Sequence, residues 1–369
     1  MKKEKRIFLA ATRQNDGKTM VGIGLLALFK ETIGEVGFIK PVGQKYLEVN
    51  GEKIDKDAIL ASRILGIGND LLKAMNPIAV ERGFTREYLN RRYRLKDLIN
   101  AIKSSYAKCA KGKEVVVIEG TGHAGVGSVF DLNNAVVARI LKASVVLITT
   151  GGIGKAIDEI MLNKALFDRE GVKLAGVIIN KVDPEKKEEL EKYLRIGLAR
   201  KGITLLGMIP YTEPLGTSTM GQIKEGLGLN LLSGTKYLNQ KVRDKIVGAM
   251  FPHNALQYIK EGSLLITSGD REDLILTALS LVMTRKAKEP HISGLILTGG
   301  IKPHKTIVEL IRNTPIPVLV SRENTYTVAS AVHDLIVKIR EDDCQKLDIA
   351  KKLVKEHVDV DKILLCPTQ

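Results

Sequence analysis

Short runs of apolar, largely β-branched residues recur along the first part of the chain, and stretches with helical spacing separate them. Six runs have the length of buried strands: 6–12, 36–42, 114–120, 144–150, 174–182 and 203–211. Because their apolar residues are continuous rather than alternating, both faces of each strand are expected to be covered. This alternation of strand and helix predicts an α/β domain with a parallel sheet over residues 1–212.

The pattern changes after Pro210. A turn-rich stretch, 212–235, leads into a second set of apolar runs and helical stretches. The expected strands are 245–250, 263–269, 292–300 and 316–321, and the expected helices are 273–285, 304–312 and 325–340. We therefore predict a second, smaller α/β domain over 213–340, followed by a charged helical tail over 341–369.

The composition fits a folded protein with anionic partners. Of the 369 residues, 44% are hydrophobic and 27% charged, and the absence of Trp indicates aliphatic cores. The net charge of +15 suits phosphorylated small molecules or nucleic acid. The densest basic run, 86–96, is expected to be a solvated helix face. We rank nucleic-acid binding last, because no aromatic stacking platform accompanies the charge.

The cysteines and the apolar stretches indicate in which cellular compartment the protein is expected. Cys109, Cys344 and Cys366 are far apart and form neither a metal spacing nor a disulfide framework, which predicts free thiols in the cytoplasm. The apolar stretch near the N-terminus is too short for a signal peptide. No run approaches the roughly 20 apolar residues of a membrane span, so we expect no membrane association.

The first strand leads into a candidate phosphate loop. Such a loop needs a strand, small residues that expose backbone N–H groups, and a helix that opens with Lys and Ser or Thr. The expected nucleotide contacts here are Thr12, Asp16, Gly17, Lys18 and Thr19. Lys18 would reach the β- and γ-phosphates of ATP, and the Thr19 hydroxyl would hold Mg²⁺. Ala11 stands where the first glycine is usual, and an ordinary helix that begins Gly-Lys-Thr is the competing interpretation.

Polar residues near the ends of other strands could complete this site. Asp57 and Glu119, together with Thr19 and phosphate oxygens, would form a hard-oxygen Mg²⁺ site. Glu119 ends an apolar strand and needs a partner, whereas Asp57 is equally consistent with a surface helix position. Lys40 would neutralise a substrate carboxylate or a transferring phosphoryl group. Its alternative is a strand-end lysine whose amine reaches solvent.

These motifs resemble the dethiobiotin synthetase family, a P-loop branch that includes the cobyrinic acid a,c-diamide synthases. The matching segments are "GFIKPVG" (37–43), "DKDAILA" (55–61), "VVVIEGTGHAG" (115–125), "GVIINKVDP" (176–184) and "GMIPY" (207–211), within residues 5–212. The resemblance implies an ATPase or a ligase that activates a small carboxylate or amine substrate, with Lys18 and Lys40 as the catalytic lysines. It also implies that Asn180, with Lys181 beside it, contacts the nucleotide base; the alternative for Asn180 is a turn residue.

The chain departs from this family on the substrate side. Ala11-Thr12-Arg13-Gln14 replaces the Gly-Thr-Asp-Thr of true dethiobiotin synthetases. Gln44 and Lys45 follow Lys-Pro-Val where a small hydroxyl residue is usual, and Thr121-Gly122-His123 replaces Ala-Gly-Gly. We therefore do not predict dethiobiotin synthesis.

The second half resembles the DRTGG domain through Asp270-Arg271 and Thr298-Gly299-Gly300. A dethiobiotin-synthetase-like domain followed by a DRTGG domain is similar to the N-terminal part of long bacterial phosphotransacetylases. That resemblance implies a regulatory role, a metabolic-enzyme partner and a homodimer. The glycine-rich turns, with Arg271 as a clamp, could bind an anion, or they could simply supply turns with positive φ.

Two functions therefore stay open from the sequence. The first is an ATP- and Mg²⁺-dependent ATPase or carboxylate-activating ligase. The second is a nucleotide-sensing regulatory module without turnover. The sequence does not name the substrate.

Overall fold

A computed structural model describes residues 4–283, 291–335 and 343–366. The chain divides into two compact units, the first formed by 1–212 with 338–369 and the second by 213–337.

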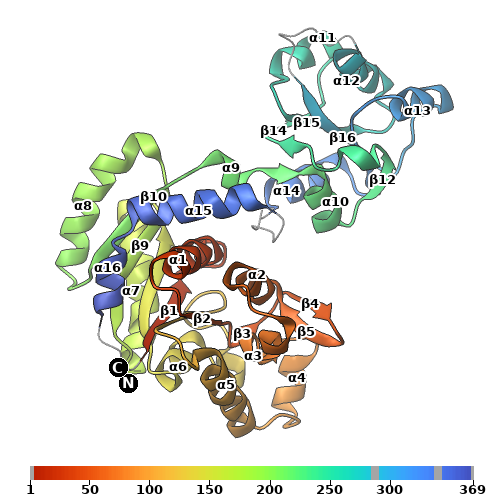
Figure 1. Cartoon of the computed structure of the whole chain (residues 1–369). Helices are drawn as coiled ribbons and strands as arrows, with labels where there is room; N and C mark the ends of the chain where they lie inside the picture. The colour runs from red at the N-terminus through yellow and green to blue at the C-terminus, as the bar shows by residue number, and fades with distance from the viewer. Residues whose placement is uncertain (1–3, 284–290, 336–342, 367–369) are drawn as a thin grey trace. The chain divides into compact units, whose positions relative to one another are not determined.

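The first unit is built on a six-stranded parallel sheet in the order β10-β9-β8-β1-β7-β2 (Figure 1). The strands are β1 (Lys5–Ala11), β2 (Val36–Ile39), β7 (Val115–Glu119), β8 (Ser144–Thr150), β9 (Leu174–Val182) and β10 (Leu205–Pro210). Their residues are almost all buried, as continuous apolar runs require. The register places Leu9 of β1 opposite Glu119 of β7, so the first strand and the acidic end of β7 reach the same edge.

Helices cover this sheet and connect its strands. The main ones are α1 (Lys18–Thr32), α2 (Lys56–Leu65), α5 (Leu95–Ala110), α6 (Asn134–Ile140), α7 (Ile153–Arg169) and α8 (Lys187–Ala199). Between β2 and α5 lie shorter elements: β3 (Val42–Gly43), β4 (Tyr46–Val49), β5 (Glu52–Asp55), α3 (Leu72–Met75), β6 (Ile78–Ala79) and α4 (Phe84–Leu89). β4 and β5 form an antiparallel hairpin, and β3 pairs with β6.

The last helices of the chain belong to this first unit. α15 (Cys344–His357) packs along α1, and α16 (Val360–Leu365) follows (Figure 1). A Cβ on Gly24 of α1 would lie 2.5 Å from Val354 Cγ2 and 2.7 Å from the Ala350 carbonyl oxygen, so the two helices approach closely only because position 24 is glycine. Within the described part of the segment expected as a charged helical tail, α15 and α16 are helical, and Ala350, Val354 and Ile363 are buried.

The second unit contains a five-stranded sheet in the order β12-β17-β16-β15-β14. Its strands are β12 (Asn230–Ser233), β14 (Asp244–Val247), β15 (Ser263–Ser268), β16 (Ile292–Thr298) and β17 (Val318–Val320), and all but the edge strand β12 run parallel. The helices are α9 (Glu213–Gly216), α10 (Met220–Leu227), α11 (Pro252–Ala255), α12 (Glu272–Met283), α13 (Lys305–Arg312) and α14 (Thr325–His333); β11 (Ser218–Thr219) pairs with β13 (Lys241–Val242).

The predicted fold class, a parallel-sheet α/β domain with a second, smaller α/β domain, is confirmed. Residues 284–285 and 336–340 of the predicted helices lie outside the described residues. The basic run 86–96 is not one helix face, because α4 ends at Leu89, Arg91 adopts a φ of 60°, and α5 begins at Leu95. No helix in the described ranges has the length and apolar character to cross a membrane.

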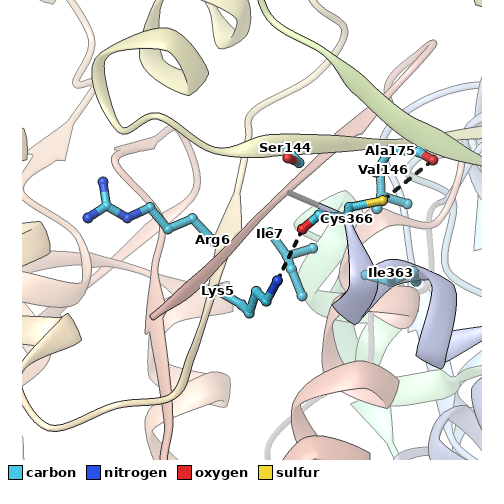
Figure 2. Close-up of a pocket in the computed structure, with 8 residues that line it drawn as sticks. All are labelled: Lys5, Arg6, Ile7, Ser144, Val146, Ala175, Ile363 and Cys366. Atoms are coloured by element: carbon cyan, nitrogen blue, oxygen red, sulfur yellow. Dashed lines mark hydrogen bonds between the residues drawn. The ribbon is translucent and has the colours of Figure 1, made fainter. Parts of the chain in front are cut away.

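A small pocket lies at the amino-terminal edge of the first sheet (Figure 2). Lys5 opens β1, Ser144 opens β8, and Cys366 follows α16; the Lys5 amine donates to the Cys366 carbonyl at 3.4 Å. Ligands of open α/β sheets bind at the opposite, carboxyl edge. The candidate site is therefore sought at the other end of these strands.

Candidate functional site

The phosphate loop joins the end of β1 to the start of α1. Asn15 and Gly17 both adopt positive φ values, 75° and 98°. A Cβ on Gly17 would overlap the side-chain amide of Asn180, which donates to the Asp16 carbonyl oxygen at 2.8 Å. The Lys181 amine donates to the Asn15 carbonyl oxygen at 2.9 Å. In this structure Asn180 and Lys181 hold the loop in place through its carbonyl groups.

Asp16 closes the first turn of the loop. Its carboxylate accepts from the Thr12 hydroxyl and from the Arg13 backbone N–H, each at 2.8 Å. Burial raises the pKa of Asp16, and these two hydrogen bonds oppose the increase. The Thr12 hydroxyl also contacts the hydroxyl of Thr149, which lies near the end of β8. Thr12 and Asp16 therefore shape the loop from inside.

Lys18 lies at the first position of α1 and is 9% exposed. Its amine donates to the Gly122 carbonyl oxygen at 2.7 Å, and within the described residues it forms no ion pair. Burial lowers the pKa of Lys18 to about 8, although the charge of Glu119 favours the protonated form. A buried cation that is shielded from water and forms no ion pair with a carboxylate is suited to bind an anionic ligand.

Lys40 lies in a buried cluster of carboxylates. Its amine contacts Asp57, lies 3.2 Å from Asp55 Oδ1, and lies 3.4 Å from Glu119 Oε1. Burial alone would lower the pKa of Lys40, but the charges of Asp57, Glu119 and Asp55 outweigh it and raise that pKa above its ordinary value. Asp57 is 4% exposed, so the surface interpretation of that residue is wrong. Lys40 is buried as well, and its amine does not reach solvent.

Asp55 and Asn76 organise this cluster, and sequence reasoning missed both. Asp55 accepts from the backbone N–H groups of Gln44, Lys45 and Asp57. The side-chain amide of Asn76 donates to the Lys40 carbonyl oxygen at 2.9 Å, and its oxygen accepts from the Asp55 backbone N–H. The signal in the sequence was weak, because an Asp before a helix is usually only a cap, which Asp55 also is.

The donor set around Thr19 fits Mg²⁺ chemically. The Thr19 hydroxyl donates to Glu119 Oε1 at 3.1 Å, and Glu119 and Asp57 meet at Lys40. Hydroxyl and carboxylate oxygens are the ligands that Mg²⁺ prefers, in combination with water and phosphate oxygens. Over the described ranges no group of three His, Cys, Asp or Glu residues is arranged to hold a metal ion. These residues would therefore hold Mg²⁺ only together with the phosphates of a nucleotide.

Helix α7 contributes two residues that the sequence did not reveal. The Glu159 carboxylate pairs with Arg13 and accepts from the Thr12 hydroxyl at 3.2 Å. The Asn163 side chain contacts the Thr12 carbonyl oxygen and the Ala124 backbone N–H. Glu159 and Asn163 are four positions apart and so lie on one face of the helix.

The motif residues of the second unit are tied into the strand ends. The N–H groups of Gly299 and Gly300, both at positive φ, donate to the carbonyl oxygens of Glu323 and Ser321 at 2.8 Å. The Arg271 guanidinium pairs with Asp273 and donates to the Met250 carbonyl oxygen at 2.9 Å. These contacts are all accounted for by the structural interpretation, in which the glycines supply turns with positive φ, without an anion.

Two family models match the chain. Residues 5–219 match that of an AAA domain, and residues 222–335 match that of the DRTGG domain. The prediction of a P-loop domain followed by a DRTGG domain is thereby confirmed.

Phosphate acetyltransferases are similar to nearly the whole chain. The one from Nitratidesulfovibrio vulgaris is 30% identical over 363 residues, which cover 96% of this chain and 50% of the relative. The one from Pseudomonas aeruginosa is 27% identical over 372 residues, with 95% and 50% covered. The chain thus spans about half the length of the curated relatives it matches, and its predicted relationship to phosphotransacetylases is confirmed.

Among solved structures, the septum site-determining protein MinD of Pyrococcus horikoshii, complexed with Mg-ADP, is 16% identical with a TM-score of 0.33. The match covers 58% of this chain and 84% of that one.

Proposed function

The chain belongs to the AAA domain family, and from this premise we propose that its phosphate loop binds ATP together with Mg²⁺. The observation that carries the proposal is Lys18, a buried lysine at the first turn of α1 whose amine contacts only a neutral carbonyl oxygen within the described residues. A phosphate group in the loop would give this amine the negative partner that it lacks, and would favour its protonated form.

The other residues take roles around the same phosphates. Thr19 would hold Mg²⁺ by its hydroxyl, with Glu119 and Asp57 on the other side of the ion. Gly17 lets the chain turn so that backbone N–H groups face the ligand. Asn180 and Lys181 would keep the loop open by holding its carbonyl groups away from the phosphates.

We propose further that nucleotide occupancy is read by a partner enzyme. Three carboxylates surround Lys40 and together outweigh its single positive charge, which supports a role within the fold over contact with a substrate. This arrangement favours a sensing role over phosphoryl transfer. The similarity to phosphate acetyltransferases supports an acyl-transfer enzyme as the partner. Dimerisation through the second unit stays a prediction, which light scattering would check.

A second candidate is ATP-dependent activation of a small carboxylate or amine, with Lys18 and Lys40 as catalytic lysines. It is favoured by one observation, that Lys40, Glu119 and Thr19 meet at the carboxyl edge of the sheet beside the loop. A phosphate-release assay against a panel of carboxylates and amines separates the two. Turnover that needs one of these compounds would support the ligase, and tight binding without release would support the sensor.

Calorimetry with ATP and Mg²⁺ tests the binding proposal itself. Lys18→Ala should abolish the binding heat that the wild-type protein gives. Lys30→Ala is the matched control, because Lys30 lies at the other end of α1 and also donates to a carbonyl oxygen, that of Ile64 at 2.7 Å. Equal binding by wild type and Lys18→Ala would refute the proposal.

A further inference from the structure

Asn163 of α7 joins the start of the phosphate loop to the 120–125 segment, to which the amine of Lys18 donates. Its side-chain nitrogen donates to the Thr12 carbonyl oxygen at 3.2 Å and to the Glu159 carbonyl oxygen at 2.9 Å. Its side-chain oxygen accepts from the Ala124 backbone N–H at 2.9 Å. Both amide protons and the oxygen are therefore engaged, and the side chain has one orientation that satisfies all of them.

The two segments joined in this way both border Lys18, which follows the phosphate loop in the chain and donates to the Gly122 carbonyl oxygen. Thr12 begins the phosphate loop, and Ala124 follows Gly122 by two residues in the segment after β7. The Gly122 carbonyl oxygen is the group on which the Lys18 amine rests, at 2.7 Å. The position of Asn163 therefore fixes the separation between the start of the phosphate loop and the acceptor of Lys18.

We propose that Asn163 is a positioning residue for the nucleotide phosphates. It holds the phosphate loop and the 120–125 segment at the separation at which Lys18 can leave Gly122 and meet a phosphate oxygen. This inference rests on the proposed function. It states that binding of the phosphate groups of the nucleotide, rather than of its base, depends on α7. A loop held in its binding geometry before the ligand arrives loses less freedom on binding.

Glu159 acts one helical turn earlier and reinforces the same loop. It accepts from the Thr12 hydroxyl, and it pairs with Arg13, whose side chain is 44% exposed. The Arg13 ion pair is open to solvent and contributes little to stability by itself. Of these two α7 residues, Asn163 is the one whose side chain hydrogen-bonds to the segment that carries Gly122, through the Ala124 backbone N–H.

The experiment measures binding of ATP and of inorganic tripolyphosphate, each with Mg²⁺, to the whole chain. Asn163→Asp keeps an acceptor for the Ala124 N–H but removes both donors, and Asn163→Leu removes all three hydrogen bonds. Each variant should raise the Kd for both ligands at least about tenfold, because one lost hydrogen bond is worth up to about that factor and Asn163→Asp loses two while Asn163→Leu loses three. Asn69→Asp, an exposed position in the same unit, adds the same charge as a control and should leave both constants unchanged.

Thermal unfolding without ligand separates positioning from folding. A residue with a structural role alone would lower the unfolding temperature and leave the Kd of the folded protein unchanged, and that result would overturn the inference. If both Asn163 variants bind the two ligands as tightly as the wild-type protein does, the inference is also overturned, while the proposed function is unaffected. If wild type and Lys18→Ala fail alike to bind either ligand, the proposed function itself falls, and this inference with it.

Discussion

The side-chain amide of Asn180 occupies the space that a Cβ on Gly17 would need. The same amide donates to the carbonyl oxygen of Asp16, the residue just before the glycine. The end of β9 and the phosphate loop thus pack against each other through the side chain of Asn180. The glycine of the Gly-Lys-Thr triplet is required here for its conformation and for the space beside it.

Gly17→Ala should therefore be costly for two separate reasons. The φ of 98° is strained for any residue with a Cβ, by about 1–2 kcal/mol, and the overlap with Asn180 adds to that. Gly34→Ala is the matched control, since Gly34 has a φ of 86° with nothing within 4 Å of its Cβ position. Urea denaturation should show a larger loss of stability for position 17 than for position 34. Equal losses would mean that the contact with Asn180 is easily relieved.

Lys40→Met should destabilise the first unit strongly. The substitution leaves the carboxylates of Asp55, Asp57 and Glu119 buried together without the ammonium they share, and breaking such a buried group costs about 3–5 kcal/mol. Lys73→Met, which removes an exposed pair with Glu52 at 2.7 Å, should cost under about 1 kcal/mol. Denaturation of each variant at neutral pH measures these losses in the free energy of unfolding.

Mg²⁺ offers a further check on the same cluster. If the ion binds Glu119 and Asp57, millimolar Mg²⁺ with ATP should recover part of the stability that Lys40→Met loses. A variant as stable as the wild-type protein would show that the three carboxylates are neutralised by other groups.

The sheet of the first unit was predictable because each buried strand is a continuous apolar run. The strands expected at 144–150 and 174–182 are β8 and β9 to the residue. The edge strand β12 of the second unit and the hairpin of β4 and β5 were not expected. Both are short and have partly exposed residues, so their patterns do not differ from those of loops.

Sequence reasoning identified those site residues that are polar or charged and lie at the end of a buried strand, in the loop that follows it, or at the start of the next helix. Lys18, Thr19, Lys40 and Glu119 come together as the parallel topology requires. Asn76 and Asn163 were not predictable. Each joins segments distant in sequence through a side-chain amide, and a lone Asn in a loop or helix carries no periodic or motif signal.

Gly24→Ala should destabilise the packing of α15 on α1. Alanine is normally a better helix residue than glycine, by up to about 1 kcal/mol. Here the added methyl would meet the backbone oxygen of Ala350 at 2.7 Å, and a backbone atom cannot move aside cheaply. Gly154→Ala in α7, where nothing lies within 4 Å, should instead be neutral or stabilising. Thermal unfolding of both variants measures the difference, and a Gly24→Ala variant at least as stable as the wild-type protein would contradict the prediction.

Lys18→Met should stabilise the protein without nucleotide in a pH-dependent way. Burial lowers the pKa of Lys18 to about 8 from 10.5, so between these values the unfolded chain holds more protons than the folded one. Stability therefore rises with pH in that window, and below pH 8 the buried charge costs up to about 3 kcal/mol. The variant should gain that amount at pH 7 and lose the gain as the pH approaches 10.5. Denaturation curves at several pH values measure both. A gain that did not change with pH would show that the favourable effect of methionine comes from packing, and it would contradict the proposal that Lys18 is a buried cation suited to an anionic ligand.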